Sequence, residues 1–377
     1  MWRSSRVLSQ KFRLYPSKTV ERRLEENLEL CRWLYNRLLE ELNKVKAEER
    51  WFTRKDTQAL IVRLKREKPE LNVVYSKVLQ MVNYQLWSNI RALAGAKRNG
   101  RKVGKLRFKG GWFKTLNYNQ SGFKLEGKKL SLSKIGTVNV KLHRFLIGKV
   151  KGVIVKRSLS GKWYAVFQVE NSGVNHLPET GKAVGLDMGV KHFLSDSNGR
   201  QIENPKFYEK SLATLRVAHR VLSRKEKGSK NRAKARVRLA RVYERLENQR
   251  DDFLHKLSRF YVNNYGVIAV EDLNITGMVK NRNFAGRILD ASWNKFFAML
   301  SYKAENAGRT LVKVNPRGTS QEYKYGELDR DYNASLNILE RALAGLGRPF
   351  VPVEVKPLLV EIPASVIVEA GSPHPSG

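Results

Sequence analysis

Two apolar runs that end in acidic residues constrain the fold of this chain most strongly. They are AVGLDMGV at 183–190 and YGVIAVEDL at 265–273. The first continues through KHFLSDSNG, which indicates two strands joined by a turn. A segment with helical spacing, WNKFFAMLSYKAENAG, is closed by Gly308, and RTLVKVNP after it has the composition of another strand. Strands that alternate with helices in this way predict an α/β fold.

The charge of the chain limits its partners. Its 377 residues include 72 Lys and Arg against 35 Asp and Glu, which gives a formal net charge of +37 and a pI of about 10.3. A chain this basic favours a polyanion as its partner. Hydrophobic residues make up 41% of the sequence, which is too many for a disordered basic tail, so we expect a folded protein with a charged surface.

The cysteine content and the hydropathy of the chain indicate the cellular compartment. The single cysteine, Cys31, cannot form an intramolecular disulfide or a cysteine zinc site. No stretch approaches the roughly 18 consecutive apolar residues that a membrane span needs, and the N-terminus lacks the apolar run of a signal peptide. We therefore expect a cytoplasmic protein that has no membrane partner.

The N-terminal half combines strands and helices. Residues 7–14 alternate as a strand would, Ser17 is a candidate N-cap, and apolar residues then recur at helical spacing in two blocks as far as Ile90. From 105 to 170, short β-rich pieces predict a small barrel or sandwich. Its basic stretches also carry aromatic residues that suit either stacking on unpaired bases or a hydrophobic core: Phe108, Trp112, Phe113, Tyr118 and Trp163.

A long basic helix is predicted over 208–258. Between Arg220 and Arg250 there are twelve Lys or Arg and three Glu, whereas a helix that is only solvated normally mixes the two signs. An apolar stripe lets one side pack, and the rest is available to a phosphate backbone. The predicted nucleic-acid-binding residues are Arg224, Lys225, Lys227, Lys230, Arg232, Lys234, Arg236, Arg238 and Arg241. After Gly347 no helical period remains, and six of the eleven prolines lie in the last thirty or so residues, which predicts a loosely ordered tail.

Three acids stand at the ends of apolar runs or at a helix start: Asp187, Glu271 and Asp331. Each alone is more typical of a turn or an N-cap. Three converging carboxylates would repel one another unless divalent cations neutralised them. That requirement is met in two-metal phosphodiester nucleases, where one ion prepares the attacking water and the other stabilises the leaving oxygen.

The chain also resembles a known family. The blocks VGLDMGVKHFLSDSNG, LSRKEKGSKNRAKARVRLARVYERLENQRDDFLHKLS, VIAVEDLNITGM, VNPRGTSQ and LDRDYNASLNIL, in that order, are similar to the signature blocks of the TnpB (OrfB) proteins of insertion sequences. The N-terminal KFRLYPSKTVERRL and the β-rich blocks match too, so that the resemblance covers about 11–343.

The resemblance implies an architecture. It predicts an α/β plus β-barrel fold: a wedge β-barrel at 1–175 that carries an inserted helical recognition lobe at about 17–98, a RuvC-like domain of the RNase H type at 176–345, and the proline-rich tail at 346–377. The RuvC-like triad would be Asp187, Glu271 and Asp331, which would bind Mg²⁺ or Mn²⁺. Asp272, on the opposite face of the strand from Glu271, and Asp329, a turn or cap residue, would be bystanders.

The family resemblance also implies a function, that of an RNA-guided DNA endonuclease related to type V CRISPR nucleases and tied to transposition. Its partners would be a guide RNA and double- and single-stranded DNA, with no small-molecule cofactor, and the protein would be prokaryotic and nucleoid-associated. One departure is plain: the family's zinc finger of two Cys-x-x-Cys pairs is replaced by EYKYGEL, so we expect no zinc. The alternatives are a guide-RNA and DNA binder that cuts poorly, acting as a repressor or relic, and, more distantly, a structural RNA-binding protein.

Overall fold

The computed structural model describes residues 6–47, 52–111, 113–146, 148–171, 176–278, 292–321, 328–350 and 360–369. The chain forms two compact units, Met1–Ser172 and Gly173–Gly377.

A seven-stranded antiparallel sheet, nearly closed like a barrel, forms the frame of the first unit. Its order is β2-β6-β7-β1-β5-β4-β3. The strand predicted at residues 7–14 is β1, and it lies inside the sheet between β7 and β5. The strands are β1 (Arg6–Tyr15), β2 (Thr115–Asn119), β3 (Phe123–Glu126), β4 (Lys129–Leu132), β5 (Gly136–Lys141), β6 (Lys149–Arg157) and β7 (Trp163–Asn171).

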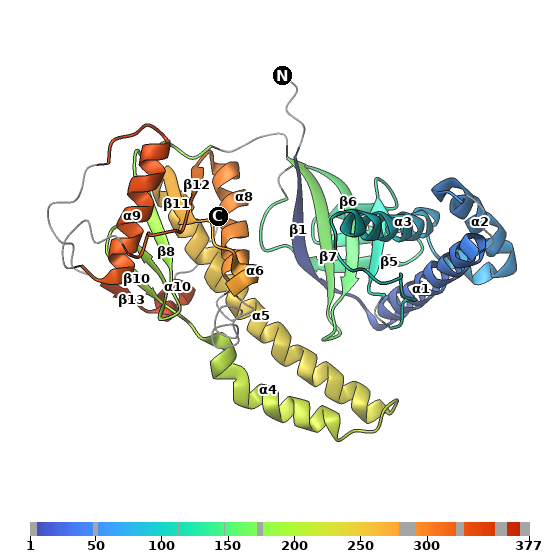
Figure 1. Ribbon diagram of the computed structural model, residues 1–377. Coiled ribbons are helices and arrows are strands. Elements are labelled where there is room, and N and C mark those ends of the chain that lie inside the picture. Colours follow the sequence, from blue (N-terminus) through green and yellow to red (C-terminus); the bar gives the residue numbers. More distant parts are fainter. Residues whose placement is uncertain are drawn as a thin grey trace. The chain divides into compact units, whose positions relative to one another are not determined.

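Three helices follow β1 in sequence and pack beside this sheet (Figure 1). They are α1 (Lys18–Ala47), α2 (Arg54–Glu67) and α3 (Ser76–Arg98), with a 3₁₀ turn at Pro69–Val73. Ser17 caps α1 as expected, since its hydroxyl accepts the Val20 N–H at 3.3 Å. One hydrophobic core joins helices and sheet, because Leu24 and Leu34 are buried together with Val138 and Phe167.

The aromatic residues of the β-rich segment divide into two kinds. Phe113, Tyr118 and Trp163 are at most 6% exposed and belong to the core, so the stacking interpretation is wrong for these three. Phe108 is 57% exposed. Trp112 lies outside the described residues.

The second unit contains a mixed sheet of order β12-β11-β8-β9-β10-β13. Strand β11 is parallel to both β12 and β8, whereas β8, β9 and β10 form an antiparallel meander, and β13 is parallel to β10. The strands are β8 (Ala183–Met188), β9 (His192–Asp196), β10 (Arg200–Glu203), β11 (Val267–Glu271), β12 (Thr310–Val314) and β13 (Val360–Ile362).

Helices cover both faces of this sheet. Ile268 and Val270 pack with α5 (Lys230–Asn264) and α8 (Trp293–Ala307) in one core. Ala269, on the opposite face of β11, packs against Ile338 of α9 (Arg330–Gly345). Gly308, at φ 70°, ends α8 as predicted. A short helix, α6 (Ile275–Met278), follows β11. Among the described residues, no helix is both long enough and apolar enough to cross a bilayer.

The prediction of a single basic helix over 208–258 is wrong. The structure has two helices, α4 (Phe207–Ser223) and α5, which form a hairpin that extends from the sheet of this unit (Figure 1). Gly228, at φ +90°, makes a turn that few other residues tolerate, and Ser229 caps α5 by accepting the Arg232 N–H at 3.1 Å. In the sequence, Gly228 and Ser229 indicate a break between two helices, but the run of Lys and Arg around them favoured one continuous helix.

The prediction of a loosely ordered tail is wrong for part of the C-terminal segment. Strand β13 extends the edge of the sheet beside β10, and α10 (Ala364–Glu369) follows it. The Ala364 N–H donates to Glu203 at 3.1 Å. Pro363 is compatible with this arrangement because it lies just after an edge strand, where no ladder hydrogen bond is lost. Residues 351–359 and 370–377 lie outside the described residues.

Candidate active site

The parallel pair β8 and β11 brings two of the predicted acids to neighbouring positions. Leu186 pairs with Val270, so that Asp187 and Glu271, one residue further on, lie at the carboxyl ends of adjacent strands. Adjacent strands are about 4.8 Å apart, and side chains at matching positions point to the same face. Both carboxylates are buried, at 8% and 7% exposure.

Helix α9 brings the third acid to the same place. Asp331 lies in its first turn, and its Oδ2 is 3.8 Å from the position that a Cβ on Gly189 would take, two residues beyond Asp187. The helix can approach β8 because residue 185 is glycine: any side chain there would collide with the Ser335 carbonyl. Residues of β8, β11 and α9 therefore meet at one end of the sheet.

Asp187 is a buried carboxyl group with two acidic neighbours. Burial, together with the nearby charges of Glu271 and Asp331, raises the pKa of Asp187 to about 8, and Arg330 only partly offsets this. Burial also raises the pKa of Glu271. A divalent cation would neutralise this concentration of negative charge.

The Glu271 carboxylate has a partner that the sequence reasoning missed. The Thr319 hydroxyl donates to Glu271 Oε1 and is also 2.9 Å from the Pro316 carbonyl. Asn337 of α9 donates to the Thr319 carbonyl at 2.8 Å, and Arg341 of α9 holds the same loop by donating to the Arg317 carbonyl at 2.7 Å. The helix that carries Asp331 thus also anchors the loop that contacts Glu271. The VNPRGTSQ block of the sequence contains Thr319, but the block does not indicate a contact with Glu271.

Asp272 and Asp329, the acids near Glu271 and Asp331 in sequence, make structural contacts. Asp272 is exposed and forms an ion pair with Lys313 at 2.9 Å. Asp329 is the N-cap of α9: it accepts the N–H groups of Asp331 and Tyr332 at 3.1 Å and the Gln201 amide at 3.0 Å. The expectations of opposite faces for Glu271 and Asp272, and of a cap at Asp329, agree with these contacts.

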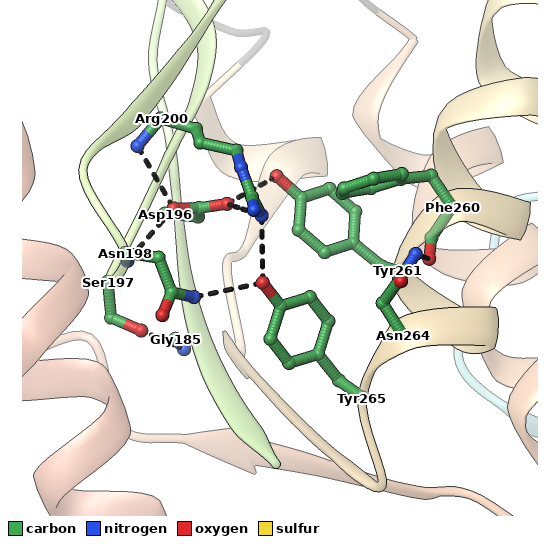
Figure 2. A network of polar contacts seen from close by, with 9 residues as sticks. All are labelled: Gly185, Asp196, Ser197, Asn198, Arg200, Phe260, Tyr261, Asn264 and Tyr265. Carbon is green, nitrogen blue, oxygen red and sulfur yellow. Dashed lines mark hydrogen bonds and ion pairs between the residues drawn. The ribbon is translucent and has the colours of Figure 1, made fainter. Parts of the chain in front are cut away.

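A buried polar network centred on β9, the strand paired with β8, supports β8 (Figure 2). Asp196, opposite Leu186 in the ladder, is fully buried and accepts the N–H groups of Asn198 and Arg200 and the Tyr261 hydroxyl. The Arg200 guanidinium, 3.5 Å from Asp196, also donates to the Tyr265 hydroxyl at 2.8 Å. This network ties the β9–β10 turn to the end of α5, and sequence reasoning did not find it.

The acids suit a hard divalent cation, although they do not enclose one. In the described part of the chain, no three His, Cys, Asp or Glu side chains are already close enough to hold an ion together. Mg²⁺ is commonly bound by one or two carboxylates together with substrate phosphates, so a complete protein cage is not required. The raised pKa of Asp187, caused by burial and by two acidic neighbours, and the all-oxygen donor set fit Mg²⁺ or Mn²⁺.

The predicted nucleic-acid-binding residues are distributed over the α4–α5 hairpin. Arg224, Lys225 and Lys227 lie in the turn, and Lys230 begins α5. All nine are exposed except Arg232. Its guanidinium donates to the carbonyls of Leu222 and Lys225, at 3.1 and 2.6 Å, and so closes the turn. Arg232 thus has a structural role that the sequence did not indicate.

Three segments of the chain match models of known protein families. Residues 166–282 match a family model, OrfB of IS605, described as "Probable transposase", 293–338 match a Cas12f1-like TNB domain, and 7–50 match a helix-turn-helix domain of the same OrfB type. A Streptomyces pristinaespiralis protein named "Putative RNA-guided DNA endonuclease" is 32% identical over 361 residues, 89% of each chain. The chain belongs to the TnpB (OrfB) family.

Other relatives extend the comparison of this TnpB-family chain. The Escherichia coli protein InsQ, given the same description, is 31% identical over 215 residues, 53% of each chain. A solved Cas12f1–sgRNA–target DNA complex contains a chain of similar fold, with a TM-score of 0.53, 13% identity, and coverage of 89% of this chain and 99% of that one. The resemblance stated from the sequence motifs is thereby confirmed.

Proposed function

We propose that this TnpB-family protein is an RNA-guided, divalent-metal-dependent DNA endonuclease associated with transposition, with a RuvC-like nuclease domain in its second unit. The observation that carries the proposal is that Asp187, Glu271 and Asp331 lie near one end of the sheet, where the other two acids help to raise the pKa of Asp187. The names of the two relatives support a nuclease guided by RNA and directed at DNA.

The three carboxylates would hold Mg²⁺ or Mn²⁺. Bound cations of this kind supply an activated water and stabilise the leaving oxygen in phosphodiester hydrolysis. Asp187 and Glu271 lie on rigid strands, and Asp331 lies on a helix packed against them, so the oxygens are held before the substrate arrives. Thr319 holds one oxygen of Glu271, and the other oxygen would face the cation.

The nucleic acid would lie along the exposed cations of the α4–α5 hairpin. Eight of the nine predicted side chains there are exposed, and acids are scarce between Arg220 and Arg250. Such a surface binds phosphates irrespective of base sequence, as expected for a protein that leaves sequence recognition to a paired guide. A guide-RNA and DNA binder of the same family that cuts poorly is the second candidate, because the family's zinc finger has no counterpart here.

The test is cleavage by the purified protein with its copurifying RNA on guide-matched duplex DNA in Mg²⁺. We expect Asp187→Ala, Glu271→Ala and Asp331→Ala each to abolish cutting while RNA binding stays unchanged. Asp272→Ala is the matched control, because it removes an exposed carboxylate adjacent to Glu271. Cutting by Glu271→Ala at the rate of the unmodified chain would refute the nuclease site, and RNA-dependent DNA binding without cutting in the unmodified chain would favour the second candidate.

A further inference from the structure

The segment between α3 and β2 holds an aromatic side chain out into solvent. Phe108 is 57% exposed, whereas Phe113, five residues later, is 6% exposed and lies in the core. A single exposed apolar residue is common on protein surfaces and alone has no functional meaning. The backbone around Phe108, however, is fixed on both sides.

Two contacts fix that backbone. On one side, Leu106 packs against the hydrophobic core of the first unit. On the other, the Asn36 side chain of α1 both accepts the Lys109 N–H at 2.6 Å and donates to the Lys109 carbonyl at 2.9 Å, which is the pairing that a neighbouring strand would provide. Arg32 of α1 also donates to that carbonyl at 3.3 Å. Phe108 thus projects from a segment whose backbone is held on both sides.

The Phe108 ring borders a groove on the side of α3. The groove has a volume of about 520 Å³ and is lined by Asn89, Ala92 and Leu93 of α3 and by residues 106–110. Small and apolar side chains make up the α3 wall, and Asn89 adds an amide. A flat aromatic side chain that lines such a groove suits a flat ligand.

The charge around the groove indicates the ligand's chemistry. From Arg91 to Lys109 the sequence contains eight Lys or Arg and no Asp or Glu. Arg107, directly before Phe108, is exposed, and the Lys109 ammonium lies 5.2 Å from the centre of the Tyr35 ring. A flat ligand joined to negative charges at a spacing of a few ångströms is a nucleobase in a strand.

We propose that Phe108 is a stacking platform for an unpaired nucleobase of a bound strand, whose flanking phosphates are held by Arg107 and its neighbouring cations. The inference rests on the proposed nucleic-acid function and adds to it a base-contacting site in the first unit, whereas the three acids belong to the second. Stacking on an aromatic face tolerates any base, so the site recognises an unpaired strand rather than a sequence.

The experiment uses the full-length protein, freed of RNA and kept in EDTA, so that no cleavage occurs. The probes are a fluorescein-labelled 20-nucleotide oligothymidylate and an abasic strand with the same number of phosphates. We expect the unmodified chain to prefer the oligothymidylate, and Phe108→Ala and Phe108→Leu each to reduce this preference by about tenfold. Phe108→Trp should retain it, because an indole also stacks.

Phe145→Ala is the matched control, because Phe145 is 77% exposed and follows Arg144 but lies outside the groove. It should leave the preference unchanged. An unchanged preference in Phe108→Ala, retention by Phe108→Leu, or an equal loss in Phe145→Ala would overturn the inference. The result does not depend on the nuclease assignment, because binding in EDTA is measured without cutting, and the triad variants test cutting alone.

Discussion

The Thr319 hydroxyl donates a hydrogen bond to the carboxylate of Glu271, although 48 residues separate the two in sequence. The Thr319 carbonyl in turn accepts from Asn337 of α9, the helix whose first turn contains Asp331. Through these two hydrogen bonds, the position of Glu271 is linked to the position of Asp331.

The first prediction follows from this link. Thr319→Val keeps the volume of the buried side chain but removes the hydrogen bond to Glu271, so the carboxylate can turn away from a cation. We expect the Mg²⁺ concentration for half-maximal cleavage to rise about tenfold, the usual minimum effect of losing a group that orients a metal ligand. Thr319→Ser restores the hydroxyl and should restore the metal response. A purely structural role would lower the unfolding temperature without moving the Mg²⁺ midpoint.

The second prediction concerns Asp329, the neighbour of the triad. Because its side chain caps α9 and also bonds Gln201, Asp329→Ala should lower the free energy of unfolding by about 1 kcal/mol. Urea denaturation measures this loss. Asp329→Asn, which can still accept the two N–H groups, is the control. If Asp329→Ala abolishes cutting while stability is unchanged, then Asp329 contributes to the chemistry and its assignment as a cap alone is incorrect.

The third prediction separates two roles on the basic hairpin. Changing Arg236, Arg238 and Arg241 together to Gln should flatten the logarithmic dependence of nucleic-acid binding on salt by about 0.7–0.9 per lost phosphate contact. Arg232→Gln should instead loosen the turn at 224–229, because its guanidinium bonds two carbonyls there, and should change the salt slope little. Equal slopes for the triple variant and the unmodified chain would mean that this face is only solvated.

The fourth prediction uses a buried base. Lys303 of α8 is 4% exposed and donates to the His255 carbonyl and the Ser258 hydroxyl of α5 at 2.6 and 2.7 Å. Burial, and then Arg259, lower the pKa of Lys303 to about 7. Above pH 7 the folded amine is neutral while the unfolded one stays protonated up to about 10.5, so the unfolded state binds more protons and stability rises with pH in that window.

The measurement compares the unmodified chain with Lys303→Met at pH 6.5 and 8.5 by urea denaturation. The unmodified chain should gain roughly 1–2 kcal/mol more than the variant between these pH values, at 1.36 kcal/mol per pKa unit. Lys303→Arg, which stays charged at both pH values, should be less stable than the unmodified chain throughout. Parallel pH profiles for the unmodified chain and Lys303→Met would show that Lys303 stays charged when buried.

Much of the fold and part of the candidate site could be predicted from local sequence. Apolar runs and the acids that follow them depend on neighbours in sequence, so β8, β11 and the strand-end positions of Asp187 and Glu271 were predictable. The Thr319–Glu271 contact and the Asp196 network were not, because each joins residues at least 48 positions apart and arises only when the sheet and helices pack. Gly228 and Ser229 could have indicated the break between α4 and α5, but the run of Lys and Arg and the continuous apolar stripe favoured a single helix.

The last prediction concerns the segment EYKYGEL, where the family's zinc finger would lie. Residues 322–327, including Gly326, lie outside the described residues, but Leu328 and Asp329 lead directly into α9, and that helix packs on β8 and β11. We therefore expect the second unit to fold without zinc. We expect it to cut, if at all, with Mg²⁺ or Mn²⁺ alone and more slowly than relatives that have the finger, because the loop cannot help to guide a strand.

Metal analysis of the purified protein tests whether the unit folds without zinc, and stoichiometric zinc would reveal ligands among the six His residues. Grafting a relative's finger between Gln321 and Leu328 tests the expected slower cutting: a folded graft that brings no gain in cleavage would show that the loss of the finger does not limit activity.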